Sequence, residues 1–253
     1  MATSQRPMST RNGFEEAFQA VILAGGQGKK LAPLTDGANK ATLPVANKPL
    51  ISYQLDYLEA AGITEVIIVV NQAAAAAPMR MVADARTTMR VSVEVTEDGV
   101  MGTADALRQI RAKLRTDFCV MPCDLQTNAQ LGAVLDAHRV HQGAVTALVV
   151  QQEKDEKKKV KTEDFIIVDE MTDALLMIAE KSQLKEALEI RRTLFDKYPR
   201  VAVRSDLADP HFYVFAHWVL DVLEKKSDFV SIKRDLLPFL LRKQYSMTTA
   251  DID

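Results

Sequence analysis

A short apolar segment followed by a long glycine-rich loop constrains the fold of this chain more than any other feature. Residues Phe18 to Leu23 are apolar enough to predict a buried strand, and Gly25, Gly26 and Gly28 follow directly. Glycine permits tight turns and lets the backbone approach a ligand closely. The lysines around this loop are Lys29, Lys30, Lys40 and Lys48. A strand, a glycine turn and nearby cations together predict a phosphate cradle.

Two common phosphate-binding motifs do not fit this loop. A P-loop requires a glycine five positions before its Gly-Lys pair, and Leu23 stands there relative to Gly28-Lys29. The dinucleotide-binding fingerprint requires a third glycine where this chain has Leu31. The next helix signal comes only at Asn47-Lys48-Pro49. A loop of this length is usually functional, so the sequence predicts a different kind of phosphate site.

Apolar segments alternate along the chain with segments of helical periodicity. The predicted strands are Gln19–Leu23, Val66–Val70, Val91–Val95, Phe118–Met121, Thr146–Val150, Phe165–Val168, Leu175–Ile178, Val201–Val203 and His211–Phe215. The predicted helices are Pro49–Ala61, Ala104–Leu114, Ala129–Gln142, Trp218–Leu223 and Ile232–Leu241. This alternation predicts an α/β, Rossmann-like fold, with a mostly parallel sheet and helices on both faces. Ligands of such folds bind beyond the carboxyl ends of the strands, where the glycine loop is placed.

The composition fits one large globular domain. The chain has 253 residues, of which 47% are hydrophobic and 26% charged, as is ordinary for such proteins. We expect a flexible polar tail over residues 1–17 and the α/β domain over residues 18–253. The formal charge of −2 argues against binding nucleic acid over a broad basic surface. No apolar run approaches the roughly 20 residues of a membrane span.

The two cysteines, Cys119 and Cys123, lie in one predicted strand. A strand advances about 3.3 Å per residue, which puts their Cα atoms roughly 13 Å apart. A disulfide requires less than about 7 Å. We therefore expect two buried or half-buried free thiols and a reducing compartment.

Three further segments remain open to more than one interpretation. The alanine run Ala73–Ala77 has three interpretations of similar weight. It could begin a helix, although Pro78 follows, it could be an engineered stretch, or its alanines could be placeholders for the residues of a poorly ordered loop. The charged stretch Glu153–Glu163 is typical of a solvated loop, with a docking patch for an acidic partner as the alternative. His138 and His141 share a helix face, which favours a surface pair over a zinc site.

The stretch from Leu23 to Ile51 resembles the signature of the nucleotide-sugar pyrophosphorylases, which join a sugar phosphate to a nucleoside triphosphate. Their pattern is Leu-Ala-Gly-Gly-x-Gly-Thr-Arg-Leu-x-Pro-Leu-Thr, followed by Pro-Lys-x-Leu-x-Pro-Val-x-x-Lys-Pro-Leu/Met-Ile. The resemblance implies the nucleotide-diphospho-sugar transferase type of α/β fold. Lys29, Lys30 and Asn39 replace the family threonine, arginine and proline. Lysine keeps the charge of arginine but lacks its planar bidentate fork.

The resemblance also implies roles for individual residues. The nucleotide-binding positions would be Leu23, Ala24, Gly25, Gly26, Gly28, Gly102 and Thr103. Glu180 and Lys181 would contact the sugar phosphate, Asp124 would bind a metal, and Lys30 and Lys40 are vestigial catalytic candidates. Mg²⁺ is the one cofactor implied, and only if the pocket is active. The residues alone also allow plainer interpretations: a helix N-cap at Gly102-Thr103, a turn at Asp124 and exposed charges at Glu180-Lys181.

Several departures from the family pattern gather around the expected pocket. Cys123 replaces the glycine before the metal-binding aspartate, and Ser182 replaces the proline after Glu180-Lys181. Pro210 and His211 stand where the family has small residues that leave room for a sugar. These replacements argue against an intact transferase site.

Other segments resemble the gamma subunits of eukaryotic translation initiation factor 2B. They are Met101–Arg108, Leu114–Asp117, Cys123–Leu125, Asp164–Asp169, Asp209–Tyr213 and Leu240–Ser246. The resemblance implies a cytosolic part of the complex that exchanges GDP for GTP on initiation factor 2. Its partners would be the other subunits, especially epsilon, and initiation factor 2, with no membrane and no direct nucleic acid. A left-handed β-helix follows in this family and is absent from the chain.

Three functional hypotheses follow. The first is a non-catalytic nucleotidyltransferase-like scaffold domain of that exchange factor. The second is an active nucleotide-sugar pyrophosphorylase, for example a mannose-1-phosphate guanylyltransferase, in which Lys30, Lys40 and Asp124 with Mg²⁺ neutralise developing charge. The third is a binding module that senses a nucleotide or a sugar phosphate without chemistry.

Overall fold

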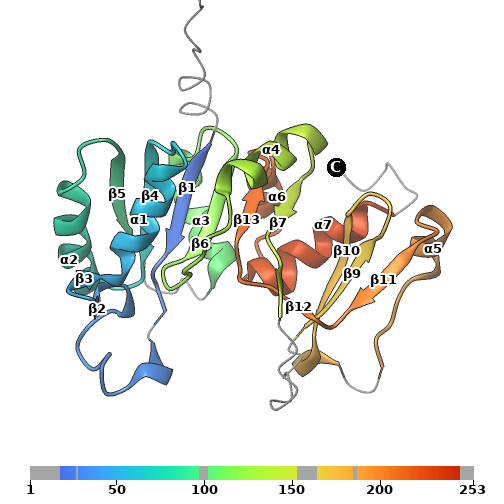
Figure 1. Ribbon diagram of the computed structural model, residues 1–253, viewed down its shortest axis with the longest axis horizontal. Helices are drawn as coiled ribbons and strands as arrows, with labels where there is room; N and C mark the ends of the chain where they lie inside the picture. Colours follow the sequence, from blue (N-terminus) through green and yellow to red (C-terminus); the bar gives the residue numbers. More distant parts are fainter. Residues whose placement is uncertain (1–17, 27, 97–101, 153–163, 185–186, 246–253) are drawn as a thin grey trace, which may run out of the picture.

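The computed structural model describes residues 18–26, 28–96, 102–152, 164–184 and 187–245, arranged as two sheets side by side with helices around them (Figure 1). The expected tail over residues 1–17 and the charged stretch Glu153–Glu163 lie outside the described residues. None of the helices in the described ranges is both long enough and apolar enough to cross a membrane.

A six-stranded sheet forms the centre of the larger part of the molecule. Its strands, in spatial order, are β5 (Arg90–Val95), β4 (Glu65–Val70), β1 (Gln19–Leu23), β6 (Phe118–Pro122), β13 (Tyr213–Phe215) and β7 (Val145–Ala147). The first four run parallel, whereas β13 is antiparallel to both of its neighbours. The prediction of a mostly parallel sheet is confirmed.

Helices cover both faces of this sheet, as predicted. One face packs against α1 (Leu50–Ala60), α2 (Ala73–Asp84) and α4 (Leu131–His141). The other packs against α3 (Thr103–Ile110), α6 (Val219–Lys225) and α7 (Leu237–Lys243). Successive strand residues point to opposite faces, so in β1 the side chain of Ile22 joins the first core and that of Val21 the second.

A smaller antiparallel sheet lies beyond α7 (Figure 1). It consists of β10 (Leu175–Glu180), β9 (Asp164–Asp169) and β11 (Val201–Arg204), in that order. The short helix α5 (Arg192–Lys197) packs on it through Leu194, which shares a small core with Ile167, Leu176 and Tyr245. Two strand pairs complete the fold: β2 (Pro44–Val45) with β3 (Lys48–Pro49), and β8 (Val150–Gln151) with β12 (Leu207–Ala208).

Three predicted elements differ from the structure. The strand predicted over Thr146–Val150 is divided, because β7 ends in the large sheet at Ala147 and β8 begins at Val150, where it pairs with β12. The helix predicted over Ala104–Leu114 ends at Ile110 and continues as a 3-10 turn. The helix predicted over Ile232–Leu241 begins with a π-helical turn, Ile232–Leu236. The alanine run lies in α2, which contains Pro78.

The prediction of free buried thiols is confirmed, since Cys119 and Cys123 are both buried and unbridged. Burial raises the pKa of each thiol to about 12. A thiol with such a pKa stays protonated and unreactive near neutral pH, so these cysteines contribute packing.

The predicted surface pair of histidines is wrong for His138. Its side chain is buried beneath Phe18, and its Nδ1 lies 2.9 Å from the Thr146 hydroxyl. Burial lowers the pKa of His138, while the nearby charge of Asp117 acts in the opposite direction. His141, one turn on, remains exposed.

This burial gives a pH-dependent stability with a defined sign. The unfolded chain binds a proton at His138 at higher pH than the folded chain does, so stability falls as the pH drops below about 6.5. We expect His138→Gln to flatten the decline in unfolding free energy between about pH 7 and pH 5. Urea denaturation at a series of pH values measures this slope. His141→Gln is the matched control, and an equal flattening in that variant would contradict the assignment.

Candidate functional site

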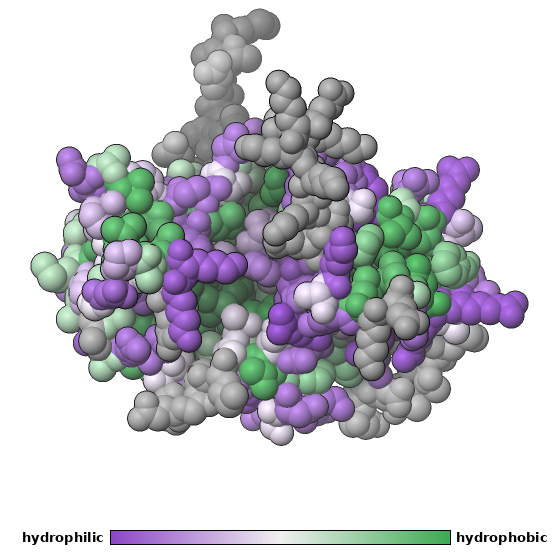
Figure 2. Space-filling model, turned by 90° about the horizontal axis from the view of Figure 1, so that it is seen from below, coloured by the Kyte–Doolittle hydropathy of each residue, from purple (hydrophilic) through white to green (hydrophobic). Residues whose placement is uncertain are grey.

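A cavity of about 550 Å³ opens at the carboxyl ends of the parallel strands. The last residues of three strands contribute to its walls: Leu23 of β1, Val70 of β4 and Pro122 of β6. Its other walls come from the start of α3, from the end of β10 and from the π-helical turn. Seen onto these strand ends, the molecule is hollowed near its middle, with hydrophobic residues deep in the hollow (Figure 2).

The glycine loop contributes to this cavity through two of its three glycines. A Cβ atom on Gly25 would lie 3.4 Å from the Asn71 side chain, and one on Gly26 would lie 3.4 Å from Lys40 Cε. Gly28 serves the loop itself: its φ is +61°, and a Cβ there would lie 2.8 Å from Thr35 Cγ2. The turn at Gly28 therefore requires glycine, whereas Gly25 and Gly26 line the cavity at positions where a Cβ atom would make ordinary contacts.

Asn39 ties the long loop to the end of β1. Its amide nitrogen donates to the Ala24 carbonyl at 2.8 Å, and its side-chain oxygen accepts from the Ala41 N–H at 2.9 Å. Asn39 thus caps a short 3-10 turn, Lys40–Thr42. This turn carries Lys40 to the cavity, so Asn39 positions the loop although it does not contact the cavity.

We expect Asn39→Ala to lower the unfolding free energy by about 1–2 kcal/mol, because it removes a cap and leaves the Ala24 carbonyl without that donor. Hydrogen exchange should speed up in residues 39–43. Asn39→Asp is the matched control, since it keeps the acceptor for Ala41 and loses only the donor, and it should give a smaller effect. Unchanged exchange in Asn39→Ala would contradict the positioning role.

The proposed metal ligand Asp124 is paired with a lysine. Lys40 Nζ donates to Asp124 Oδ2 at 2.8 Å, and the two side chains are 18% and 48% exposed. Lys40 is among the residues around the cavity, whereas Asp124 lies beside it, beyond the end of β6. The described ranges contain no group of three or more His, Cys, Asp or Glu side chains placed to hold a metal ion. The Asp124 carboxylate is thus directed to an ammonium group of the same chain.

The start of α3 is engaged by another segment of the chain. Ala104 N–H donates to the Val230 carbonyl at 2.9 Å, and Ile232 N–H donates to the Thr103 hydroxyl at 2.9 Å. A Cβ atom on Gly102 would lie 2.2 Å from the Val230 carbonyl oxygen. Gly102 therefore admits the backbone of Val230, and the segment that leads into the π-helical turn fills part of the space beside the helix start.

Arg108 of α3 also holds the segment that leads into the π-helical turn. Its Nε donates to the Leu223 carbonyl at 2.8 Å, and its Nη2 donates to the carbonyls of Lys226 and Phe229, each at 2.9 Å. One guanidinium group on α3 thus holds the chain that runs from α6 to the π-helical turn.

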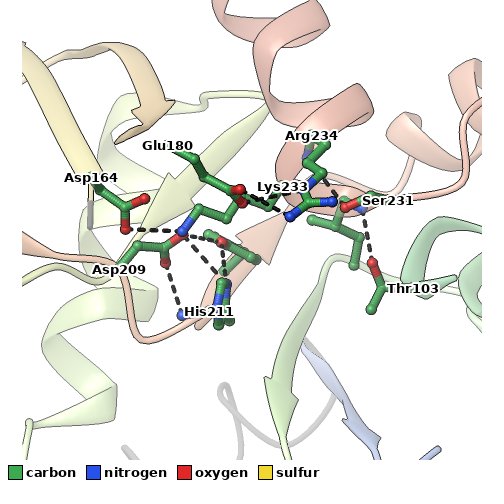
Figure 3. Close-up of polar contacts among 10 residues, drawn as sticks. Thr103, Asp164, Glu180, Asp209, His211, Ser231, Lys233 and Arg234 are labelled. Atoms are coloured by element: carbon green, nitrogen blue, oxygen red, sulfur yellow. Dashed lines mark hydrogen bonds and ion pairs between the residues drawn. The ribbon is translucent and has the colours of Figure 1, made fainter. Parts of the chain in front are cut away.

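The far wall of the cavity is a network of charged side chains (Figure 3). Arg234 donates to the Glu180 carboxylate at 3.0 Å. Lys233 Nζ lies 2.9 Å from Asp164 Oδ2 and 3.4 Å from Asp209 Oδ2, and all three side chains are largely buried. The π-helical turn presents both basic residues to the network, in keeping with the frequent placement of such turns at functional sites.

Asp209 is the centre of this network. Its carboxylate accepts from the Tyr213 hydroxyl at 2.5 Å and from the His211 backbone N–H at 2.8 Å. Burial by itself raises the pKa of Asp209, but these hydrogen bonds and the nearby His211 side chain lower it below its usual value. Burial, followed by the charge of Asp209, raises the pKa of the Tyr213 hydroxyl. Asp209 is therefore ionised and Tyr213 protonated near neutral pH.

Glu180 is held in its charged form in the same way. Burial raises its pKa, but the hydrogen bond and charge of Arg234, with the charge of Lys233, lower the pKa overall. The carboxylate that would contact a sugar is thus neutralised by a neighbouring arginine.

The structure brings together some of the predicted site residues and separates others. Those around the cavity are Leu23, Gly25, Gly26, Lys40, Gly102, Thr103 and Glu180. Those outside its lining are Ala24, Gly28, Lys30, Asp124 and Lys181. Ala24 is fully buried, and its N–H donates to the Val69 carbonyl at 2.8 Å. Lys30 and Lys181 are exposed.

The sequence analysis missed several residues of the cavity wall. Lys233 and Arg234 add basic charge to that of Lys40, and Asn71 and Thr96 follow β4 and β5. One signal was available for Asn71, because a polar residue directly after a buried parallel strand lies at the ligand-binding edge. Lys233 and Arg234 lie in the segment Ser231–Pro238, which resembles a motif of the pyrophosphorylases, but its sequence does not show that a π-helical turn presents both to the cavity.

Comparison with known proteins agrees with this architecture. Residues 19–250 match the family model described as Nucleotidyl transferase. The chain is 33% identical over 238 residues to translation initiation factor eIF2B subunit gamma of Schizosaccharomyces pombe, covering 90% of this chain and 52% of that protein. It is 26% identical to mannose-1-phosphate guanylyltransferase 1 of Arabidopsis thaliana, covering 83% of this chain and 67% of that protein. It thus spans about half the length of the eIF2B gamma relative.

A solved structure shows the same fold. The crystal structure of a Bacillus anthracis protein assigned as a glucose-1-phosphate thymidylyltransferase superposes with a TM-score of 0.69, over 90% of this chain and 85% of that chain, at 18% sequence identity. At that identity the likeness concerns the fold alone. The family match, the order of the strands and the glycine loop at their carboxyl ends together show that this chain belongs to the nucleotidyl transferase family, with eIF2B gamma subunits among its relatives.

Proposed function

We propose that this chain is a non-catalytic, nucleotidyltransferase-like scaffold domain of the exchange factor for translation initiation factor 2. The similarity to an eIF2B gamma subunit over 90% of the chain supports membership of that complex. The pairing of the charged side chains at the cavity supports a scaffold role and argues against nucleotidyl transfer.

One observation carries the non-catalytic part of the proposal: the charged groups of the cavity are paired with one another. Lys40 pairs with Asp124, Arg234 with Glu180, and Lys233 with Asp164 and Asp209. A nucleoside triphosphate needs cations that remain available to its phosphates. Here a ligand would first have to separate these ion pairs. The side chains of Lys233, Asp164 and Asp209 are also largely buried.

The donor set around the cavity also fits Mg²⁺ poorly. Magnesium prefers an octahedral shell of oxygens, with one or two carboxylates from the protein. Asp124 follows the end of β6, and its Oδ2 accepts from Lys40. The Cys123 side chain before it is fully buried beneath the strand end. We therefore derive no catalytic step through a metal ion.

The scaffold proposal implies protein partners. We expect the chain to associate with other subunits of the exchange factor, epsilon above all, and to support binding of initiation factor 2 in the cytosol. It requires neither a membrane nor direct contact with nucleic acid.

Co-expression tests the assembly part. The chain, carrying an affinity tag, is produced together with an epsilon subunit, and the purified material is analysed by size-exclusion chromatography. We expect the two proteins to co-elute in a fixed ratio. The matched control is the Arabidopsis guanylyltransferase, which belongs to the similar proteins and should leave epsilon unbound. Epsilon that elutes alone in both cases would contradict the assembly role.

The alternative of an active transferase is supported by the cavity itself, which retains Gly25, Gly26 and Lys40 at its rim. It predicts formation of a nucleotide-sugar, whereas the scaffold predicts none. A third possibility, binding without chemistry, predicts heat in calorimetry with GTP, GDP or sugar phosphates. The ion pairs of the cavity favour no measurable heat.

A further inference from the structure

A second apolar hollow lies at the end of the molecule that carries the small sheet. Its volume is about 370 Å³, and it is bordered by β10, by the start of α5 and by α7. Its floor consists of Leu176, Ile178, Leu194, Leu241 and Tyr245, none of them more than 6% exposed. We call it the α7 groove. It shares no residue with the cavity at the strand ends.

Hydrophobic side chains also reach the surface elsewhere on the part of the molecule that carries the small sheet. Phe195 of α5 and Val203 of β11 are each 50% exposed. In the space-filling view, hydrophobic residues gather at the right-hand end, over the part that carries the small sheet, with hydrophilic residues around them (Figure 2). A contiguous apolar surface rimmed by polar groups is typical of an interaction site.

The segments that frame the groove are strongly basic. Residues 187–200 and 238–245 contain six lysines and arginines but only two acidic residues, Glu189 and Asp196, in a chain whose net charge is −2. Positive charge is thus concentrated at this end of an otherwise slightly acidic protein. Such a local field attracts acidic partners and speeds their association.

Two arginines stand at the mouth of the groove. Arg191 and Arg242 are both among its lining residues and both exposed, and they outnumber the one acidic lining residue, Glu189. Their positive charges act on the phenol of Tyr245, where they oppose the rise in its pKa that burial causes, so both lie close to one side chain. Within the described ranges neither forms an ion pair with an acidic residue, and Arg242 Nε donates to the Pro238 carbonyl at 3.0 Å.

We propose that the α7 groove docks an acidic peptide segment of a partner protein, with one bulky apolar side chain seated between α7 and β10 and flanking carboxylates bound by Arg191 and Arg242. The volume admits one or two side chains and no helix. Arginine binds carboxylates through two parallel N–H bonds, which fixes their position as well as adding energy. A buried apolar anchor with charged neighbours at the rim is the usual arrangement of an interface hot spot.

A peptide fits this surface better than other anionic partners. A nucleic acid would use the arginines for its phosphates and leave the apolar floor empty. An anionic membrane would need a protruding apolar surface, whereas the floor here is recessed. The proposal goes beyond the scaffold role, because it concerns different residues and holds for any partner of this chemistry.

Selection from a random library of displayed 12-residue peptides tests the proposal without choosing a sequence in advance. We expect the selected peptides to carry Leu, Ile, Phe or Met with Asp or Glu on both sides. A fluorescent peptide of the selected consensus is then titrated by anisotropy against the chain. Replacing its apolar anchor by alanine should weaken binding at least 10-fold.

Two double variants of equal charge locate the site. Arg191→Glu with Arg242→Glu should weaken binding of the consensus peptide at least 10-fold. Arg80→Glu with Arg90→Glu changes the net charge equally, at exposed positions far from the groove. This control should change the affinity for the peptide less than 2-fold. Circular dichroism melts verify that both variants are folded.

Several outcomes would overturn the proposal. They are a selection without acidic, apolar enrichment, equal losses in the two double variants, and tighter binding of phosphatidylserine vesicles or of a single-stranded RNA than of the peptide. A dimer in sedimentation velocity that the groove variant dissociates would assign the surface to a second copy of the chain. Failure of epsilon to co-elute would leave this result untouched, so the two proposals fail separately.

Discussion

The substitution Gly102→Ala is expected to lower the unfolding free energy by about 3 kcal/mol, because it overfills a closely packed site. The added Cβ would lie 2.2 Å from the Val230 carbonyl oxygen and 2.6 Å from Val230 Cγ1. The backbone of Val230 cannot move away cheaply. It accepts from Ala104 N–H at the start of α3, and Arg108 holds the preceding carbonyls of Lys226 and Phe229.

The same substitution should also loosen the wall of the cavity. Displacement of Val230 would weaken the bond from Ile232 N–H to the Thr103 hydroxyl, and the π-helical turn with Lys233 and Arg234 follows directly. Urea denaturation measures the loss of stability, and hydrogen exchange in residues 230–236 should report the local loosening.

Gly132→Ala provides the matched control for this prediction. Gly132 lies in α4, and a Cβ atom there would have nothing within 4 Å. Alanine should therefore raise the stability by about 0.5 kcal/mol, because it lowers the entropy of the unfolded chain. If the two variants had the same stability, the tight contact at Gly102 would be disproved.

The second large effect is expected for Lys233→Met, with a loss of about 3–5 kcal/mol, because it removes one partner of a buried ion pair. Lys233 is 13% exposed, and its carboxylate partners Asp164 and Asp209 are 6% and 1% exposed. Methionine has a similar length but no charge, so two buried carboxylates would be left facing each other without a cation.

Arg234→Met is the control for a neighbouring cation of the same network. Arg234 is 59% exposed, and an exposed ion pair contributes at most about 1 kcal/mol. We therefore expect a loss several times smaller than in Lys233→Met. Comparable losses would show that the network is not organised around the buried lysine.

The sequence allowed much of the central sheet to be predicted. β1, β4 and β6 are largely apolar runs that are buried on both faces, and their predicted bounds agree with the structure within one residue, as do those of the more exposed edge strand β5. The local sequence pattern suffices for such elements, because parallel strands that are buried on both faces consist of nearly continuous hydrophobic residues. The position of the glycine loop at the strand ends followed from this topology.

Elements that depend on distant partners were harder to predict. β7 stops at Ala147 because the chain leaves the large sheet for a pairing with β12, some 60 residues later in the sequence. His138 is buried because Phe18 and Thr146 close over it. The helix pattern around it shows only which face of α4 it occupies, and not what covers that face.

The candidate site shows the same division. Gly25, Gly26, Gly102 and Thr103 were predicted, because short motifs specify the loop and the helix start on which they lie. The pairing of Lys40 with Asp124 joins residues 84 positions apart, and that of Glu180 with Arg234 joins residues 54 positions apart. Only the folded chain shows that these oppositely charged side chains neutralise each other.

The most direct test of the scaffold account is the release of pyrophosphate from GTP and mannose-1-phosphate in the presence of Mg²⁺. The purified chain is compared with a reaction that lacks protein, and the Arabidopsis mannose-1-phosphate guanylyltransferase serves as the positive control. The account predicts no release above the protein-free rate, since Lys40, Lys233 and Arg234 are held by carboxylates of the same chain. Repeated turnover to GDP-mannose that Lys40→Ala or Asp124→Ala abolishes would contradict it and assign the chain to the active transferases.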